Sequence, residues 1–243
     1  MALYLLLIWN LLAPTYGVLS AILLNRKEKT AIMHRMCHFF TINIHACKFV
    51  DHDKEMKKKI QAAGPTILLY NHRTTADFFL ALMATSPGRS CYISRWAVFF
   101  LSPIGCSVAA ISRGLIFFKR SNKNPQQTRR NLFSKIQKRL NQGISLILFP
   151  EGTRHQGEQT LPLKKGALKW AYKNNIKCAI VLQYGNENVL STKTLKIKRH
   201  VTIHTLHEGL YDPDDFPNAQ EFIKTIEPHF QSGYEKLKQL AKK

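Results

Sequence analysis

Short apolar segments rich in β-branched residues alternate with stretches of helical periodicity through the middle of the sequence, and this alternation most constrains the fold. Strands separated by helices are typical of α/β domains with a mainly parallel sheet. We therefore predict an α/β fold whose mainly parallel sheet is flanked by helices. The segments expected to form strands are residues 66–70, 115–118, 144–149, 179–184 and 201–206.

The expected helices are marked by their starts or by an apolar face. Asn124 followed by Pro125 is typical of an N-cap and a first helical position, and residues 163–173 indicate a further helix. The C-terminal segment repeats apolar residues at helical spacing around Pro228, which is expected to kink it. We interpret that stripe as core packing. Its residues are Phe222, Ile226, Phe230, Tyr234 and Leu237.

The N-terminus differs from the rest of the chain because residues 3–24 carry no charged side chain. A helix of that length rises about 33 Å, which spans a hydrocarbon core of about 30 Å. A cleaved signal peptide and a buried core helix are the alternatives, and Pro14 and Gly17 can split the segment into a re-entrant hairpin. We expect a membrane helix or hairpin within residues 1–50 and a folded domain over residues 51–243. The cations Arg26, Lys27 and Lys29 favour a cytoplasmic domain.

The charge of the chain is strongly positive, with 36 Lys and Arg against 15 Asp and Glu. A partner with negative charge is therefore expected, and nucleic acid, an anionic bilayer or a phosphorylated small molecule would each fit. Residues 78–150 contain no acid at all. Most of their cations are expected on a solvated basic face, but the length of the stretch suggests a surface or cleft that faces phosphate. The five scattered cysteines lack zinc-site spacing and indicate a reducing compartment without a metal site. The cations of the acid-free stretch are Arg89, Arg95, Arg113, Lys119, Arg120, Lys123, Arg129, Arg130, Lys135, Lys138 and Arg139.

The segment from Asn71 to Asp77 directly follows an expected strand and places His72 at its carboxyl end, where α/β sheets present functional side chains. Asp77, at the start of the next helix, is positioned to accept a hydrogen bond from one imidazole nitrogen. The other nitrogen would then accept a proton, as in acyl-transfer catalysis. Taken alone, this spacing is more often that of a turn histidine followed by a helix-capping aspartate.

Two further segments carry candidate residues. In the sequence Phe-Pro-Glu-Gly-Thr-Arg at residues 149–154, glycine permits close approach of the backbone to a ligand and Arg154 suits bidentate contact with phosphate. A surface turn with an internal Glu–Arg pair is the alternative. Residues 114–120 form a strand that ends in two cations.

Together and in this order, the three segments resemble those of the glycerolipid acyltransferases, a family of bacterial and eukaryotic 1-acylglycerol-3-phosphate acyltransferases. The shared pattern is N-H-x4-D, G-x-x-F-x-x-R and F-P-E-G-T-R, and residues 161–166 also resemble the family's next segment. The resemblance covers residues 67–185, roughly half of the chain. Two positions depart from the pattern, because Leu182 replaces the usual proline of a fourth block and His155 a common serine.

The resemblance implies direct acyl transfer with His72 as general base and Asp77 as its orienter. It also implies that residues of the other two blocks shape the acceptor site, where the arginines meet its phosphate. No cofactor is implied beyond an acyl-CoA or acyl carrier protein as donor. The implied acceptor-site residues are Gly114, Phe117, Arg120, Glu151, Gly152, Thr153 and Arg154.

We therefore expect a membrane-bound enzyme, with its catalytic domain on the cytoplasmic side, that converts 1-acylglycerol-3-phosphate into phosphatidic acid. Its partners would be the lipid bilayer, acyl-CoA and a phosphorylated lysolipid. Lysocardiolipin, lysophosphatidylinositol or glycerol-3-phosphate are alternative acceptors. An alternative of another class is a non-enzymatic binder of nucleic acid or anionic lipid; nucleic acid is not expected, because the sequence shows no signature of a nucleic-acid-binding fold.

Overall fold

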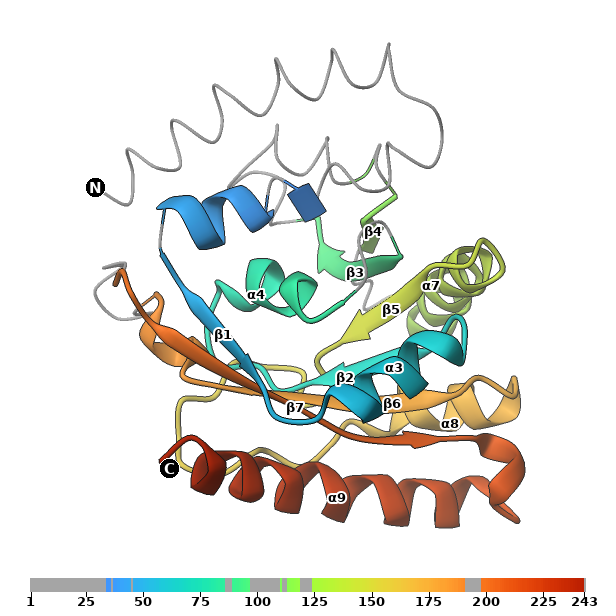
Figure 1. Ribbon diagram of the computed structural model, residues 1–243. Coiled ribbons are helices and arrows are strands. Elements are labelled where there is room, and N and C mark those ends of the chain that lie inside the picture. Colours follow the sequence, from blue (N-terminus) through green and yellow to red (C-terminus); the bar gives the residue numbers. More distant parts are fainter. Residues whose placement is uncertain are drawn as a thin grey trace.

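The computed structural model describes residues 34–35, 37–44, 46–85, 89–96, 110, 113–118, 124–190 and 198–242. These residues form one seven-stranded sheet in the order β1-β7-β6-β2-β5-β3-β4 (Figure 1). Neighbouring strands are parallel except β6 and β7, which are antiparallel. The predicted α/β fold with a mainly parallel sheet is thereby confirmed.

Five of the strands were predicted from the sequence, and β1 and β3 were missed. β1 is a four-residue edge strand with two exposed positions, and β3 interrupts its apolar residues with serine and arginine, so neither has the apolar run of a buried strand. The strands are β1 Lys48–Asp51, β2 Ile67–Tyr70, β3 Ser90–Arg95, β4 Leu115–Phe118, β5 Ser145–Leu148, β6 Cys178–Tyr184 and β7 Thr202–Tyr211.

Helices cover both faces of the sheet. α7, α8 and α9 pack on the face that presents Ile67 and Leu69, whereas α3 and α4 pack on the face that presents Leu68 and Tyr70. In Figure 1, α8 and α9 run along the lower side of the sheet and α4 lies above it. The helices are α3 Lys54–Ala62, α4 Asp77–Met83, α7 Pro125–Leu140, α8 Lys165–Lys173 and α9 Ala219–Leu240, with a π-helix, η1 Phe39–Ile44, and 3-10 turns η2 Asn186–Asn188 and η3 Pro213–Asp215.

The two faces of β2 show why the strands are buried on both sides. Successive side chains of a strand point to opposite faces, and all four residues of β2 are buried because each face has its own layer of helices. The apolar stripe of α9 is buried in the first of these layers, as the sequence predicted. α9 is one continuous helix with Pro228 inside it.

The expected membrane segment over residues 3–24 lies outside the described residues. Within the described ranges, none of the helices is both long and apolar enough to cross a bilayer. The expected domain boundary after residue 50 falls inside β1, which pairs in parallel with β7 and so belongs to the sheet.

Candidate active site

The candidate site lies at the carboxyl ends of β2 and β5. These strands are adjacent and parallel, with Leu69 paired to Leu148, so the loops that follow them leave the sheet side by side. The first loop carries His72 and the second carries Glu151 and Arg154. Asn71 anchors the first loop, because its side-chain amide exchanges two hydrogen bonds of 2.8 Å with the backbone of Gln183 on β6.

His72 and Asp77 are in direct contact, as their spacing predicts. His72 Nδ1 lies 2.8 Å from Asp77 Oδ2, and the two side chains are 13% and 1% exposed. Because an ionised carboxylate only accepts hydrogen bonds, the proton of this contact belongs on Nδ1. The lone pair of the neutral ring is then on Nε2, which is the arrangement of a general base.

Asp77 is held by a set of donors that fixes its position. Its Oδ2 also accepts from the backbone N–H groups of Arg73 at 2.6 Å and Thr74 at 2.9 Å, and its Oδ1 accepts from Asn186 Nδ2 at 2.8 Å. These N–H groups precede α4, whose N-cap is Ala76. The carboxylate therefore organises the loop of His72, and the helix-capping alternative does not describe it.

Two phenylalanine rings fix the plane of the imidazole. His72 stacks on Phe149 with ring centroids 4.2 Å apart and planes inclined by 17°, and Phe78 meets the imidazole edge-on at 6.0 Å. Hydrogen bonding and stacking together restrict the ring to one orientation, so that Nε2 is presented in a fixed direction.

Glu151 joins the two loops. It is 1% exposed, its Oε1 accepts from the backbone N–H of His72 at 2.8 Å, and its Oε2 accepts from that of Leu161 at 2.8 Å. The backbone N–H of His155 donates in return to the carbonyl of His72 at 2.9 Å. Both carboxylate oxygens thus bind backbone groups, which makes Glu151 a residue that positions the base.

The exposed residues of the second loop face the first loop. Arg154 donates through Nη1 to the Thr75 hydroxyl at 2.5 Å, and Thr153 is exposed beside it. Gly152 has φ +74°, and a Cβ there would lie 3.2 Å from two carbon atoms of Lys164. Glycine therefore permits the positive φ of this turn and the close approach of the Lys164 side chain to it.

The third predicted segment contributes differently. Gly114 precedes β4, and its carbonyl accepts from the backbone N–H of Tyr92, so it lies at the edge of the sheet opposite His72. Phe117, near the carboxyl end of β4, stacks on Trp96 with centroids 4.8 Å apart. Arg120 lies outside the described residues. The structure therefore brings Glu151 and Arg154 to the His72 loop and does not bring Gly114 there.

Sequence reasoning missed Arg73, the residue after the histidine. Its side chain is 1% exposed, and its guanidinium donates to the carbonyls of His155 at 2.8 Å, Gly157 at 2.6 Å and Gln159 at 3.1 Å. It also lies 4.3 Å from the ring centroid of Tyr234 on α9. No local signal reveals this role, because every partner lies more than eighty residues away. Arg73 clamps the second loop onto the first.

The arrangement supports proton abstraction from a hydroxyl group beside a cationic loop. An oriented imidazole supplies the base, and exposed guanidinium and ammonium groups supply contacts for an anionic substrate. Within the described ranges, no group of three or more histidine, cysteine, aspartate or glutamate residues is arranged to hold a metal ion.

Comparison with known proteins agrees with this geometry. A family model described as Acyltransferase matches residues 51–181, which is more than half of the chain. The human 1-acyl-sn-glycerol-3-phosphate acyltransferase beta is 26% identical over 137 residues, covering 56% of this chain and 47% of that protein. The 1-acyl-sn-glycerol-3-phosphate acyltransferase of Helicobacter pylori is 27% identical over 152 residues, covering 62% and 61%.

A solved structure extends the likeness to the fold. The 1-acyl-sn-glycerophosphate acyltransferase PlsC from Thermotoga maritima superposes with a TM-score of 0.70 at 17% identity, covering 98% of each chain. The matched regions span about half the length of the relatives compared by sequence.

Proposed function

Because the chain belongs to the acyltransferase family, we propose that it transfers a fatty acyl group from acyl-CoA to the sn-2 hydroxyl of 1-acylglycerol-3-phosphate, giving phosphatidic acid. The observation that carries this proposal is the contact between His72 and the buried carboxylate of Asp77. Arg154 donates a hydrogen bond to Thr75 of the same loop. The names of the similar human and bacterial proteins support the choice of acceptor.

In the proposed mechanism His72 Nε2 takes the proton of the acceptor hydroxyl as its oxygen attacks the thioester carbonyl. The C–S bond then breaks, and the departing thiolate takes the proton from His72, so that base and charge are restored. Asp77 stabilises the imidazolium that forms between these steps. No acyl-enzyme intermediate forms in this mechanism, because the acceptor hydroxyl itself attacks the thioester and no side chain of the protein does.

The phosphate of the acceptor is proposed to bind at the loop after β5. Arg154 and Lys164 provide the positive charge there, and the exposed hydroxyl of Thr153 provides a further donor. Glu151 supports this loop through its hydrogen bonds to backbone N–H groups, and Gly152 supports it by adopting the positive φ of the tight turn. A phosphorylated headgroup therefore docks on the same loop that Glu151 ties to the base.

We further propose that the enzyme is membrane-bound through its N-terminal apolar segment, with the catalytic domain on the cytoplasmic side. The 22 uncharged residues from position 3 to position 24 and the cations that follow them support this placement. An acyl donor from the cytoplasm and a lysolipid from the bilayer would then reach the same site.

A thiol-release assay on the purified full chain tests the proposal, with oleoyl-CoA as donor and a panel of acceptors. We expect thiol release that depends on 1-acylglycerol-3-phosphate and produces phosphatidic acid. A stronger response to lysocardiolipin, lysophosphatidylinositol or glycerol-3-phosphate would replace the acceptor and keep the chemistry. No release with any acceptor, together with salt-sensitive binding of DNA or anionic vesicles, would overturn the enzymatic proposal.

A further inference from the structure

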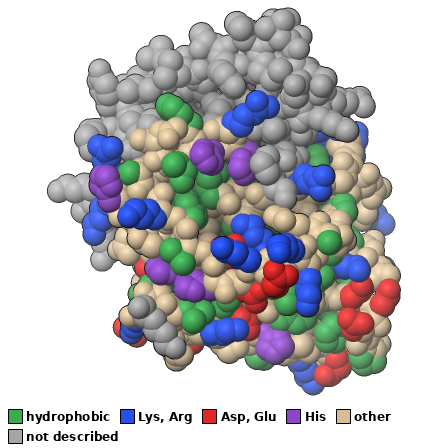
Figure 2. Space-filling model, in the orientation of Figure 1, with side chains coloured by type: hydrophobic (Ala, Val, Ile, Leu, Met, Phe, Trp, Pro, Cys, Tyr) green, Lys and Arg blue, Asp and Glu red, His purple; other side chains and the backbone are tan. Residues whose placement is uncertain are grey.

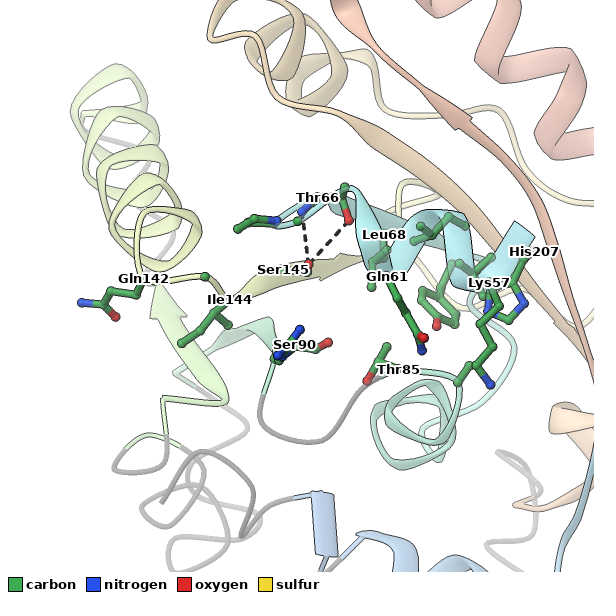
Figure 3. Close-up of a pocket in the computed structure, with 18 of the residues that line it drawn as sticks. Lys57, Gln61, Thr66, Leu68, Thr85, Ser90, Gln142, Ile144, Ser145 and His207 are labelled. Atoms are coloured by element: carbon green, nitrogen blue, oxygen red, sulfur yellow. Dashed lines mark hydrogen bonds between the residues drawn. The ribbon is translucent and has the colours of Figure 1, made fainter. Parts of the chain in front are cut away.

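A second candidate site lies at the opposite edge of the sheet. A cavity of about 720 Å³ opens at the amino-terminal ends of the parallel strands, where Thr66 precedes β2, Ser90 begins β3 and Ser145 begins β5 (Figure 3). Its volume lies within the usual range of ligand pockets. None of the residues assigned above to the candidate active site lines it, so it is a separate site.

The cavity is lined by arginines that no described carboxylate neutralises. Arg89 and Arg113 line it, and they lie close together because the register that pairs Tyr92 with Leu115 places Ser90 beside Arg113. Among the described residues, none that lines the cavity is acidic, and neither arginine forms an ion pair with a described carboxylate. Both belong to the acid-free stretch of residues 78–150.

A third arginine adds to this positive charge. Nη1 of Arg113 and Nη1 of Arg139 each lie 3.3 Å from the same side-chain oxygen of Gln142. Burial lowers the pKa of Arg139, and the nearby charge of Arg113 lowers it further. Two guanidinium groups that share one neutral acceptor repel each other, and an anion between them would relieve that repulsion. Arg113 also has φ +62°, a left-handed backbone conformation that is rare for arginine.

The other end of the cavity is already neutralised. Lys57 Nζ lies 3.0 Å from Asp51 Oδ2, and Asp51 Oδ1 lies 3.2 Å from His207 Nδ1. Lys57 and His207 are seen together at one side of Figure 3. Unpaired positive charge in the cavity is therefore concentrated at the end formed by Arg89 and Arg113.

The walls between these two ends are largely apolar. Ile60 from α3, Leu68 from β2, Ile144 before β5 and Val181 from β6 line the cavity and are themselves almost fully buried by their neighbours. The polar groups between β2 and β5 bond to each other, because Ser145 Oγ accepts a hydrogen bond from the backbone N–H of Thr66 at 3.1 Å. In Figure 3, Gln61, Thr85 and Ile144 approach the space from different sides.

We propose that this cavity binds an anionic glycerophospholipid, with its phosphate at Arg89 and Arg113 and part of its acyl chain along Leu68 and Val181. Cations at one end of an apolar cavity fit a molecule that is charged at one end only. The surroundings favour its approach, because α3 carries Lys54, Lys57, Lys58 and Lys59 against one glutamate, and basic side chains gather over α3 in Figure 2. The source of the lipid is either the reaction product or the bilayer itself.

Titration calorimetry of soluble short-chain lipids with the full chain tests this site. The acyl donor is left out, so that no reaction takes place. We expect dihexanoyl phosphatidic acid to bind. Arg113→Gln or Arg89→Gln should weaken its binding at the cavity by about tenfold or more, as loss of a charged hydrogen bond does. Arg129→Gln, which removes an equal charge from the exposed surface of α7, is the matched control and should bind as the wild type does. Thermal unfolding of each variant verifies its fold.

Further probes separate the sources and the alternatives. Preference for dihexanoyl phosphatidic acid over dihexanoyl phosphatidylglycerol supports the product, and equal binding of both supports bilayer lipid. Equal binding of dihexanoyl phosphatidylcholine would overturn the charge assignment. Glycerol-3-phosphate or inorganic phosphate binding as tightly as the lipid, and with the same dependence on Arg113, would overturn the role of the apolar walls. Unchanged lipid binding in both arginine variants would remove the site.

Discussion

Among the described residues, two histidine–aspartate pairs lie at different places on the same sheet, and the difference between them shows what a general base requires. His72 Nδ1 lies 2.8 Å from Asp77 at the carboxyl ends of β2 and β5, whereas His207 Nδ1 on β7 lies 3.2 Å from Asp51 on β1. The His207 side chain is 2% exposed, against 13% for His72. The same two functional groups therefore stand in different surroundings.

The carboxylates differ more than the imidazoles. Asp77 accepts only from neutral amide donors besides His72, so its charge is directed at the imidazole. Asp51 is shared with the ammonium group of Lys57, and although burial opposes its ionisation, His207 and Lys57 lower the pKa of Asp51. Burial lowers the pKa of His207, and the backbone of Ala84 also bonds to it. Asp77 thus serves one imidazole, whereas Asp51 is shared by His207 and Lys57, which both line the cavity at the other edge of the sheet.

The largest expected effect of this difference is on turnover. His72→Ala should lower kcat by about 10² to 10⁴-fold, because it removes the general base, while His207→Ala should leave kcat close to that of the wild type. Thiol-release kinetics on both purified variants, with circular dichroism to verify folding, make the comparison. Similar losses in the two variants would show that His72 has no special chemical role.

Removing the carboxylate charge sharpens the same contrast. Asp77→Asn removes the negative charge and replaces one of the two oxygens that together accept four hydrogen bonds with an N–H donor, so the imidazolium loses its carboxylate partner. We expect kcat to fall by about 10²-fold or more and unfolding free energy by about 1–3 kcal/mol. Asp51→Asn should lower stability with little change in kcat. Kinetics and urea unfolding measure both; a matching fall in kcat for Asp51→Asn would contradict the distinction.

The contrast also explains what could be predicted from the sequence. His72 and Asp77 are five residues apart at a strand-to-helix transition, so local reasoning places them together. The contacts of Glu151 with His72, of Arg73 with His155 and of Asn186 with Asp77 could not be predicted in this way, because they join residues 79, 82 and 109 positions apart. Pairing at that range is decided by the order of strands in the sheet.

The acid-free stretch shows the same limit for charge. The stretch suggests a surface or cleft that faces phosphate but does not say where it lies. Arg89 and Arg113 precede β3 and β4 and therefore lie at the amino-terminal edge, away from His72. Residues before a parallel strand and residues after it are placed at opposite edges. Because β3 was not recognised from its sequence, the position of Arg89 could not be predicted, and only the structure separates the two groups of cations.

A smaller effect on catalysis is expected from a substitution at the residue proposed to bind the acceptor phosphate. Arg154→Ala should raise KM for the phosphorylated acceptor by about tenfold, as loss of a charged hydrogen bond does, with a smaller change in kcat. Arg130→Ala, on the exposed surface of α7, is the matched control and should leave KM unchanged. Initial rates at varied acceptor concentration separate the two constants. An unchanged KM in Arg154→Ala would place the phosphate elsewhere.

The smallest effect concerns the pH dependence of stability. Because burial lowers the pKa of His207 in the folded protein, the unfolded chain binds a proton more readily below pH 6.5, and folding stability falls as the pH drops from 6.5 through the folded pKa. The contribution of His207 is fully present above pH 6.5. His207→Gln removes this titration, so its unfolding free energy, measured in urea between pH 8 and pH 5, should fall less steeply than that of the wild type. An equally steep fall in the variant would show that other groups govern acid destabilisation and that burial does not hold His207 neutral.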